Sequence, residues 1–223
     1  MEIVKPVIEV EKYDGVKIMK RLERACRTCY RSEGLITEDS YKHLLSNCIN
    51  RGHESILEHE KITVRITCDI GVYKDLTRHR AGASFSIEST RYCNYSKDKY
   101  TNNIKFIEPV YSDQKEKYDI WLKAMNEIET NYLEMSKLGA AADELRMMLP
   151  HSTAAEVTMT CNIREWKHVL SLRCSRFAHP AVRQVMIPLL LKFKKDMPEI
   201  FDNVEYDENF PKEKYASIKT MKD

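Results

Sequence analysis

The sequence has few glycines and prolines, and it has none of the glycine-rich patterns that commonly hold a nucleotide. Six glycines and seven prolines are spread over 223 residues, so no flexible linker marks a domain boundary. A GxGxxG turn and a P-loop are both absent, which argues against a doubly wound nucleotide fold. We expect a single domain over residues 1–223, with residues 202–223 as a loosely held tail.

The sequence also lacks a strong charge of one sign and a long apolar run. Its formal net charge is only +2, so no overall field attracts nucleic acid or an anionic membrane. The longest apolar run, residues 185–191, is interrupted by Pro188 and is too short to span a bilayer. Residues 1–6 lack the apolar core of a signal peptide. We therefore expect a cytoplasmic protein that binds neither membrane nor nucleic acid.

The seven cysteines are scattered along the chain. Cys26 and Cys29 form a CxxC, a pattern found in redox sites and in halves of zinc sites. No second CxxC follows at zinc-finger spacing, so buried free thiols in a reducing compartment are the better interpretation. Residues 52–59 are dense in histidine and glutamate but contain no HExxH. We expect no metal site.

Hydrophobic periodicity predicts a helix-rich α+β protein. Apolar residues at helical spacing predict helices over residues 16–30, 38–49, 71–79, 114–138, 140–148, 162–173 and 180–195. Alternation of apolar and polar residues predicts half-buried strands over residues 61–68 and 155–161. The fold class is therefore α+β, a helix-rich single domain with a small antiparallel sheet. We interpret the apolar stripe of helix 114–138 as core, and we expect Asn162 and Glu165 to cap the following helix reciprocally.

Residues 78–92 read Arg-His-Arg-Ala-Gly-Ala-Ser-Phe-Ser-Ile-Glu-Ser-Thr-Arg-Tyr and form the most informative segment. Arginine presents a planar fork of donors that suits phosphate or carboxylate, and hydroxyls and small-residue amides complete such a site. A solvated basic loop is the simpler interpretation of Arg78-His79-Arg80. The hydroxyls of Ser89 and Thr90 and the guanidinium of Arg91 favour an anion site instead.

This segment resembles the signature of the flavin-dependent thymidylate synthases, in which Arg-His-Arg is followed by a serine and then by Arg-Tyr. Three further motifs occur in the family's order. They are the Gly-His-Glu-Ser stretch at residues 52–55, Arg146 ahead of Leu149-Pro150, and the helix that carries Asn162, Arg164, His168 and Arg173. The resemblance covers residues 52 to 179.

The resemblance implies reductive methylation of dUMP to dTMP, with 5,10-methylenetetrahydrofolate as carbon donor, NADPH as reductant and FAD as hydride carrier. It also implies a homotetramer whose active sites are shared between subunits. Arg173 would be the catalytic residue, stabilising the pyrimidine ionised at N3. From the residues alone, Arg173 is explained equally well by the favourable position of a cation at a helix C-terminus.

The resemblance further implies which residues contact the two ligands. The expected flavin contacts are His53, Ser55, Arg78, His79, Arg80, Ile87, Asn162, Arg164 and His168, with His53 also near the folate. The expected nucleotide contacts are Asp75, Leu76, Thr77, Arg78, Ile87, Glu88, Ser89, Thr90, Arg91, Arg146 and Arg173. Two positions depart from the family pattern. Asp75 stands where a longer glutamine or glutamate is common, and Ile87 can offer only its backbone where the family often has Glu or Gln.

The residues alone leave two other functions open. An RNA- or single-strand-binding module would use the arginines of residues 78–91 on phosphates and stack bases on Tyr92, Tyr95 and Tyr100, although the near-neutral charge argues against it. A nucleotide enzyme without flavin, such as a dUMP-using hydrolase, would need a cluster of acidic magnesium ligands, which the sequence does not display.

Overall fold

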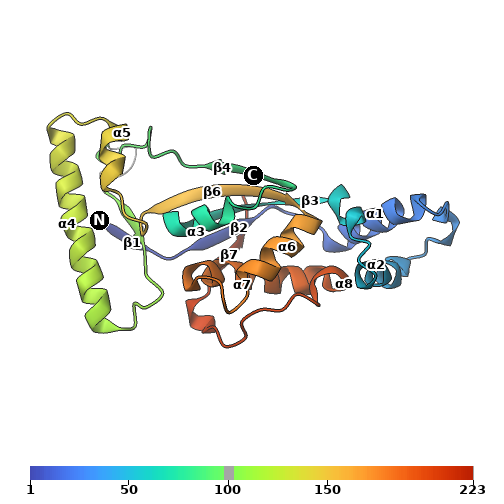
Figure 1. The fold of residues 1–223 in the computed structure, drawn as a ribbon. Helices are drawn as coiled ribbons and strands as arrows, with labels where there is room; N and C mark the ends of the chain where they lie inside the picture. The colour runs from blue at the N-terminus through green and yellow to red at the C-terminus, as the bar shows by residue number, and fades with distance from the viewer. Residues whose placement is uncertain (98–102, 223) are drawn as a thin grey trace.

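A five-stranded sheet organises the protein (Figure 1). The computed structural model describes residues 1–97 and 103–222. The strands lie in the order β4 (Ala83–Ile87), β6 (Ala154–Asn162), β3 (Lys61–Asp69), β2 (Val7–Val10) and β7 (Ser217–Thr220). A second pairing joins β1 (Glu2–Val4) to β5 (Lys105–Ile107) in parallel. The predicted α+β class is confirmed, and the main sheet is antiparallel except where β2 meets β7.

The pairing of β3 with β6 forms the centre of the sheet. It runs from Lys61 opposite Asn162 to Asp69 opposite Ala154. The predicted alternation is confirmed, because the buried side chains over the predicted ranges are Ile62, Val64, Ile66 and Cys68 on β3 and Ala155, Val157, Met159 and Cys161 on β6. Strands β1, β2, β4, β5 and β7 were not predicted. Each has only three to five residues, which is too short for a clear period-two pattern.

Helices lie at both ends and along one side of the sheet. They are α1 (Gly15–Thr28), α2 (Ser40–Asn50), α3 (Ile70–Leu76), α4 (Lys115–Lys137), α5 (Ala142–Leu145), α6 (Ile163–Arg173), α7 (Pro180–Asp196) and α8 (Pro198–Phe201). In Figure 1, α4 and the α1–α2 pair stand at opposite ends of the sheet. The helix predicted over residues 140–148 is instead the short α5 followed by a 3-10 turn, Arg146–Met148. No helix in the described ranges is both long and apolar enough to cross a membrane.

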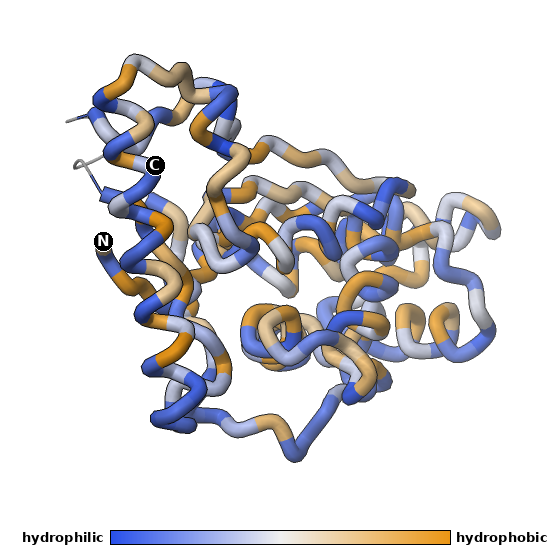
Figure 2. The backbone as a smooth tube through the Cα atoms, turned by 60° about the vertical axis from the view of Figure 1, so that its left-hand side comes forward, coloured by the Kyte–Doolittle hydropathy of each residue, from blue (hydrophilic) through white to orange (hydrophobic). Residues whose placement is uncertain are grey.

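Buried side chains form two hydrophobic clusters. The larger one joins the main sheet to α1, α2, α6 and α7. The smaller one contains Phe106, Trp121, Met125 and Tyr132 and lies between β5 and α4. Along α4, hydrophobic and hydrophilic segments alternate in Figure 2, as in a helix with one packed face. The interpretation of the α4 stripe as core is therefore confirmed, while the single domain stays a prediction.

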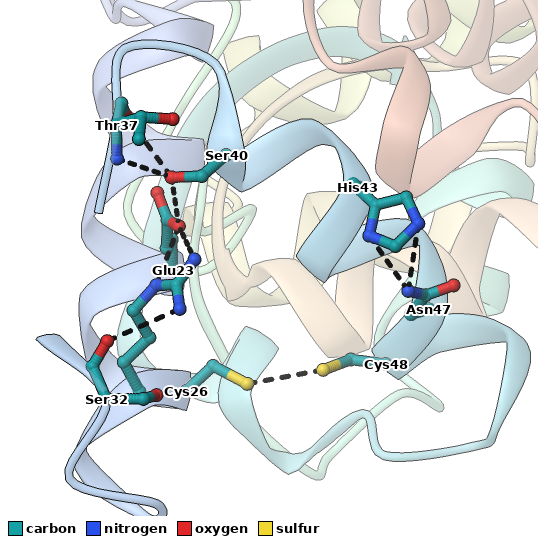
Figure 3. Close-up of polar contacts among 9 residues, drawn as sticks. Glu23, Cys26, Ser32, Thr37, Ser40, His43, Asn47 and Cys48 are labelled. Atoms are coloured by element: carbon teal, nitrogen blue, oxygen red, sulfur yellow. Dashed lines mark hydrogen bonds and ion pairs between the residues drawn. The ribbon is translucent and has the colours of Figure 1, made fainter. Parts of the chain in front are cut away.

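A buried ion pair and a serine hold α1 against the start of α2 (Figure 3). Arg27 Nε donates to Glu23 Oε1 at 2.9 Å, and Ser40 Oγ donates to the same oxygen at 2.6 Å. Thr37 N donates in turn to Ser40 Oγ at 2.9 Å. Because a buried carboxylate is stable only when it is paired and hydrogen-bonded, these contacts attach the start of α2 to α1.

All seven cysteines are unpaired, and five of them are buried. Cys26 of the CxxC lies 3.2 Å from Cys48, sulfur to sulfur, and Figure 3 shows the two side chains pointing toward each other. Burial raises the pKa of Cys26, which makes it a poor nucleophile. Its CxxC partner Cys29 is exposed. The prediction of buried free thiols is confirmed for Cys26 and wrong for Cys29.

The segment after Asp202 is packed, so the prediction of a loosely held tail is wrong as far as residue 222. Strand β7 pairs with β2 along its whole length. Val204, Phe210 and Ala216 are each at most 5% exposed, and the ring of Phe210 stacks on Tyr215 with a centroid distance of 6.1 Å. The sequence did not indicate this packing, because the three buried apolar residues are widely spaced among many charged ones.

Phe210→Ala should lower the free energy of unfolding by about 3 kcal/mol, because it removes a buried aromatic ring. Denaturant unfolding measures this loss. Leu138→Ala is the control, since Leu138 is 88% exposed and its truncation should change stability by less than about 0.5 kcal/mol. A Phe210→Ala protein as stable as the wild type would show that this ring does not hold the C-terminal segment.

Candidate functional site

Helix α6 presents the residues of the site, and two side-chain hydrogen bonds fix its start. Asn162, the last residue of β6, accepts a hydrogen bond from Glu165 N at 2.8 Å and so caps the helix. The fully buried Trp166 donates its indole N–H to Ile62 O on β3 at 2.9 Å. The direction of α6 is therefore set by the strands beneath it.

Gly82 brings the segment after Arg-His-Arg against the start of α6. Its φ is +68°, in the left-handed region, and a Cβ at this position would lie 2.3 Å from Asn162 Nδ2. Gly82 O accepts the backbone N–H of Asn162 at 3.0 Å. Half of the predicted reciprocal cap is therefore confirmed, since Asn162 Oδ1 accepts from Glu165 N. The other half is wrong, because the Asn162 N–H donates to Gly82 O and not to the Glu165 side chain.

The side chain of Glu165 faces His79 instead. His79 Nδ1 lies 3.2 Å from Glu165 Oε1, and His79 Nε2 accepts the Nε–H of Arg173 at 3.0 Å. Arg173 also donates through Nη2 to Asp75 O at 2.7 Å. Two sequence segments more than 80 residues apart thus meet in one hydrogen-bonded network of Glu165, His79 and Arg173.

His79 is neutral at neutral pH. Burial lowers its pKa to about 4, and the positive charges of Arg173 and Arg78 act in the same direction. The ring of His168 packs edge-on against it with a centroid distance of 5.6 Å. A neutral imidazole keeps one ring nitrogen as an acceptor, which is what the Nε–H of Arg173 requires.

His79, Glu165 and His168 are also the one group of three potential metal ligands found among residues 1–97 and 103–222, with ligand atoms within 4.8 Å of one another. Both ring nitrogens of His79, however, already have partners in Glu165 and Arg173. Hydrogen bonding accounts for this arrangement without an ion.

The loop that carries His53 and Ser55 begins at a glycine turn. Gly52 has a φ of +74°, and its N–H bonds to Ile49 O while His53 N–H bonds to Cys48 O. This pair of bonds is a Schellman motif, and it ends α2 at the position expected for Gly52. The side chains of His53 and Ser55 are exposed as they leave the turn.

Two ion pairs tie this loop to α6. Lys167 donates to Glu54, and Arg164 Nη1 lies 2.6 Å from Glu58 Oε1. Glu58 belongs to a 3-10 turn, η2 (Ser55–His59). The expected flavin residues from residues 52–59 and those from α6 therefore lie beside one another.

A cavity of about 870 Å³ opens between this loop and α6. Its lining includes Gly82, Asn162, Arg164, Glu165, Lys167 and His168. Three of the expected flavin contacts, Asn162, Arg164 and His168, thus share one cavity. Arg78 and Arg80 are exposed in the adjoining segment.

The expected nucleotide residues after β4 lie away from this cavity. Ala83 at the start of β4 is opposite Cys161, next to Asn162, whereas Ile87 at its end is opposite Val157. Four residues of extended chain span about 13 Å. Within one chain, Ile87, Glu88, Ser89, Thr90 and Arg91 are therefore at the other end of β4 from Asn162. There Glu88 accepts from Tyr95 Oη at 2.9 Å, and Arg91 lies over the ring of Tyr92.

The remaining expected nucleotide contacts are close to α3. Asp75 and Thr77 are half-exposed at its end, but the side chain of Leu76 is fully buried, which leaves only its backbone for a ligand. Arg146 is exposed and near enough to Tyr73 on α3 that its charge opposes the rise in the pKa of Tyr73 caused by burial.

Sequence comparison relates the chain to one protein family. The family model described as thymidylate synthase complementing protein, Thy1, matches residues 16–199. The flavin-dependent thymidylate synthase of Pyrococcus abyssi is 34% identical over 161 residues, which are 72% of this chain and 65% of that protein. The corresponding protein of Pyrococcus furiosus is 31% identical with the same coverage. The chain thus spans just under two thirds of the length of these relatives.

Two solved structures have a similar fold. A UMP/dUMP methylase from Streptomyces cacaoi, bound with 5-Br dUMP, matches with a TM-score of 0.73 and 22% identity, covering 91% of this chain and 96% of that one. Thymidylate synthase X from Helicobacter pylori, with FAD and dUMP, matches with a TM-score of 0.71 and 19% identity, covering 89% and 98%. At these identities the similarity establishes the fold.

Gly82→Ala should lower the free energy of unfolding by about 1–2 kcal/mol from backbone strain alone, and more because the new Cβ displaces Asn162 from the α6 cap. Gly34→Ala is the matched control, because residue 34 has open space around its Cβ and no left-handed φ. Thermal unfolding of the two variants compares them. Equal melting temperatures for both would contradict the role given to Gly82.

Proposed function

Because the chain belongs to the thymidylate synthase complementing protein family, we propose that it is a flavin-dependent thymidylate synthase. It methylates dUMP reductively to dTMP, with 5,10-methylenetetrahydrofolate as carbon donor, NADPH as reductant and FAD as the bound hydride carrier. The observation that carries this proposal is the Arg173 guanidinium, which His79 and Asp75 O hold in one orientation. His79 in turn contacts Glu165 on the wall of the α6 cavity.

The cavity beside α6 is suited to FAD. Gly82 is exposed and lines this cavity, so its backbone is open to the close approach of a ligand. Arg164 on the cavity wall and the exposed Arg78 and Arg80 supply cations for a diphosphate. His53, Ser55, Asn162 and His168 complete the proposed contacts. When bound, FAD supplies hydride transfer, which no side chain can provide.

The role of Arg173 follows from the charge that develops on the substrate. The uracil ring becomes negatively charged as its C5 turns nucleophilic, and a fixed guanidinium stabilises that charge without reorganising. The acceptors that hold Arg173 are a neutral imidazole and a backbone carbonyl. The nearest carboxylate oxygen, Asp75 Oδ1, is 3.8 Å from Nη1. The positive charge of Arg173 is therefore only weakly compensated and stays available to the substrate.

The proposal includes a homotetramer with shared active sites. Residues 87–91 begin about 13 Å along β4 from Ala83, which lies beside the α6 cap. A neighbouring subunit can bring its own Ser89, Thr90 and Arg91 to the Arg173 of the first. This arrangement unites all the proposed dUMP contacts in one site.

A cytoplasmic location is part of the same proposal, because seven unpaired cysteines suit a reducing compartment.

The alternative function as a nucleic-acid-binding module loses support. Tyr95, one of its three stacking residues, is only 7% exposed, and its hydroxyl is bonded to Glu88. Tyr100, another of the three, lies outside the described residues.

The Arg173→Ala protein should still bind flavin, but its rate of dTMP formation should fall by at least about 100-fold, because the change removes a donor aimed at the charge that develops on the uracil ring. Visible absorbance of the purified protein reports bound oxidised FAD, and bands that bleach anaerobically with NADPH report its reduction. Arg24→Ala on the exposed face of α1 is the control and should remain active. A colourless wild-type protein that takes up no added FAD contradicts the proposed function, and an active Arg173→Ala enzyme contradicts the role of Arg173.

Mixing two inactive variants tests the shared site. Arg173→Ala and Arg91→Ala proteins should each be inactive, whereas hybrids formed by subunit exchange contain some sites with both arginines intact. We expect dTMP formation to reappear on mixing, up to a fraction of the wild-type rate set by random assembly. Exchange itself is verified by native mass spectrometry. Hybrids that form and remain inactive would place both arginines in the same subunit's site.

A further inference from the structure

We propose that Glu165 is a positioning residue of the active site, which fixes the tautomer of His79 and through it the orientation of Arg173. This inference rests on the proposed function for its kinetic consequence, whereas its structural content does not depend on any activity. Glu165 was assigned only a capping role by the sequence, and that role belongs instead to Gly82 O and Asn162.

The tautomer of His79 follows from its two neighbours. An arginine N–H can donate but never accept, so His79 Nε2, 3.0 Å from Arg173 Nε, must carry a lone pair. In a neutral ring the single proton is then on Nδ1. Glu165 Oε1, 3.2 Å from Nδ1, is the acceptor for that proton.

Because both side chains are buried, the Nδ1–H of His79 depends on Glu165 as its acceptor. The side chains of His79 and Glu165 are 5% and 10% exposed, so water cannot readily replace the carboxylate as acceptor. Without the carboxylate, the buried Nδ1–H loses its partner, which is unfavourable. Moving the proton to Nε2 relieves this loss but sets two donors, Nε2–H and the Nε–H of Arg173, against each other.

Arg173 depends on this acceptor for its orientation. Nε and Nη2 form one edge of the planar guanidinium, and both have protein acceptors in His79 and Asp75 O. The edge formed by the two terminal nitrogens has only Asp75 Oδ1 nearby, at 3.8 Å from Nη1, and is thereby left toward a ligand. A donor at His79 Nε2 would turn the plane about its remaining bond to Asp75 O. The edge presented to the pyrimidine would then change.

Two substitutions of Glu165 separate positioning from mere packing. Glu165→Leu removes the acceptor at similar size, and we expect kcat to fall by about 100-fold, the loss typical of a misplaced catalytic group. KM for dUMP should change little, because Arg173 acts mainly on charge that forms during the reaction. Glu165→Gln keeps an amide oxygen that can accept from Nδ1–H, and it should retain most of the activity.

Glu23→Gln is the matched control. Glu23 is an even more deeply buried carboxylate with an arginine partner on α1, and it does not line the cavity. This change should reduce stability and leave kcat at the wild-type value, so a loss of kcat confined to Glu165→Leu cannot be ascribed to general destabilisation.

Solid-state ¹⁵N NMR of protein with labelled histidine reads the tautomer directly, with the His79 signal identified by its absence in His79→Gln. We expect a protonated Nδ1 and an unprotonated Nε2 in the wild type and in Glu165→Gln, and proton density on Nε2 in Glu165→Leu. This readout requires no catalysis. If the wild type makes no dTMP, the proposed function is wrong, but the His79 tautomer measured by NMR still tests whether Glu165 positions His79.

Three results would overturn the inference. One is a wild-type His79 protonated at Nε2, which decides the matter even if Glu165→Leu does not fold. Another is wild-type kcat in a folded Glu165→Leu enzyme. The third is an equal loss of kcat in Glu165→Gln and Glu165→Leu, which would show that the charge of Glu165 matters and its accepting geometry does not.

Discussion

The antiparallel pairing of β3 with β6 determines where the site lies. Each strand leads directly into a helix, β3 into α3 and β6 into α6, and the strands point in opposite directions. The two helices therefore start from opposite ends of the paired strands and meet over the sheet. Asp75 and His79 come at the end of α3, and Arg173 comes at the end of α6, where these residues are in hydrogen-bonding contact.

This geometry has a chemical consequence for the cation at its centre. A guanidinium held by carboxylates would have its charge largely neutralised by the protein. Arg173 is held instead by an uncharged ring and a carbonyl oxygen, and the one carboxylate nearby is at 3.8 Å. The acid of the site, Glu165, acts on Arg173 only through His79. The fold thus orients the charge without cancelling it.

The sequence predicted the long elements of the fold and grouped three of the residues that line the α6 cavity, Asn162, Arg164 and His168. Nine-residue strands such as β3 and β6 contain enough alternation to identify, whereas β7 has four residues in a charged segment and is recognisable only from its pairing with β2. Asn162, Arg164 and His168 are close in sequence and so could be grouped in advance.

Contacts between distant segments could not be predicted in this way. Glu165 stands three residues after a good cap, a spacing that already explains it locally, and nothing local indicates that it faces His79. The spacing of Arg78 and Arg91 suggests a single cradle, but the intervening strand β4 carries the end of this segment away from the cavity. Only the register of β4 against β6 reveals that separation.

The two ion pairs between the loop at residues 54–58 and α6 differ in how strongly dissolved salt weakens them. Lys167 and Glu54 are 13% and 28% exposed, whereas Arg164 and Glu58 are 50% and 47% exposed. Mobile ions screen exposed charges far more than shielded ones. Rising ionic strength therefore loosens Arg164 from Glu58 first, while Lys167 keeps the loop attached to the helix. Arg164 is the adjustable partner of the two, free to exchange a carboxylate for another anion without the loop coming away.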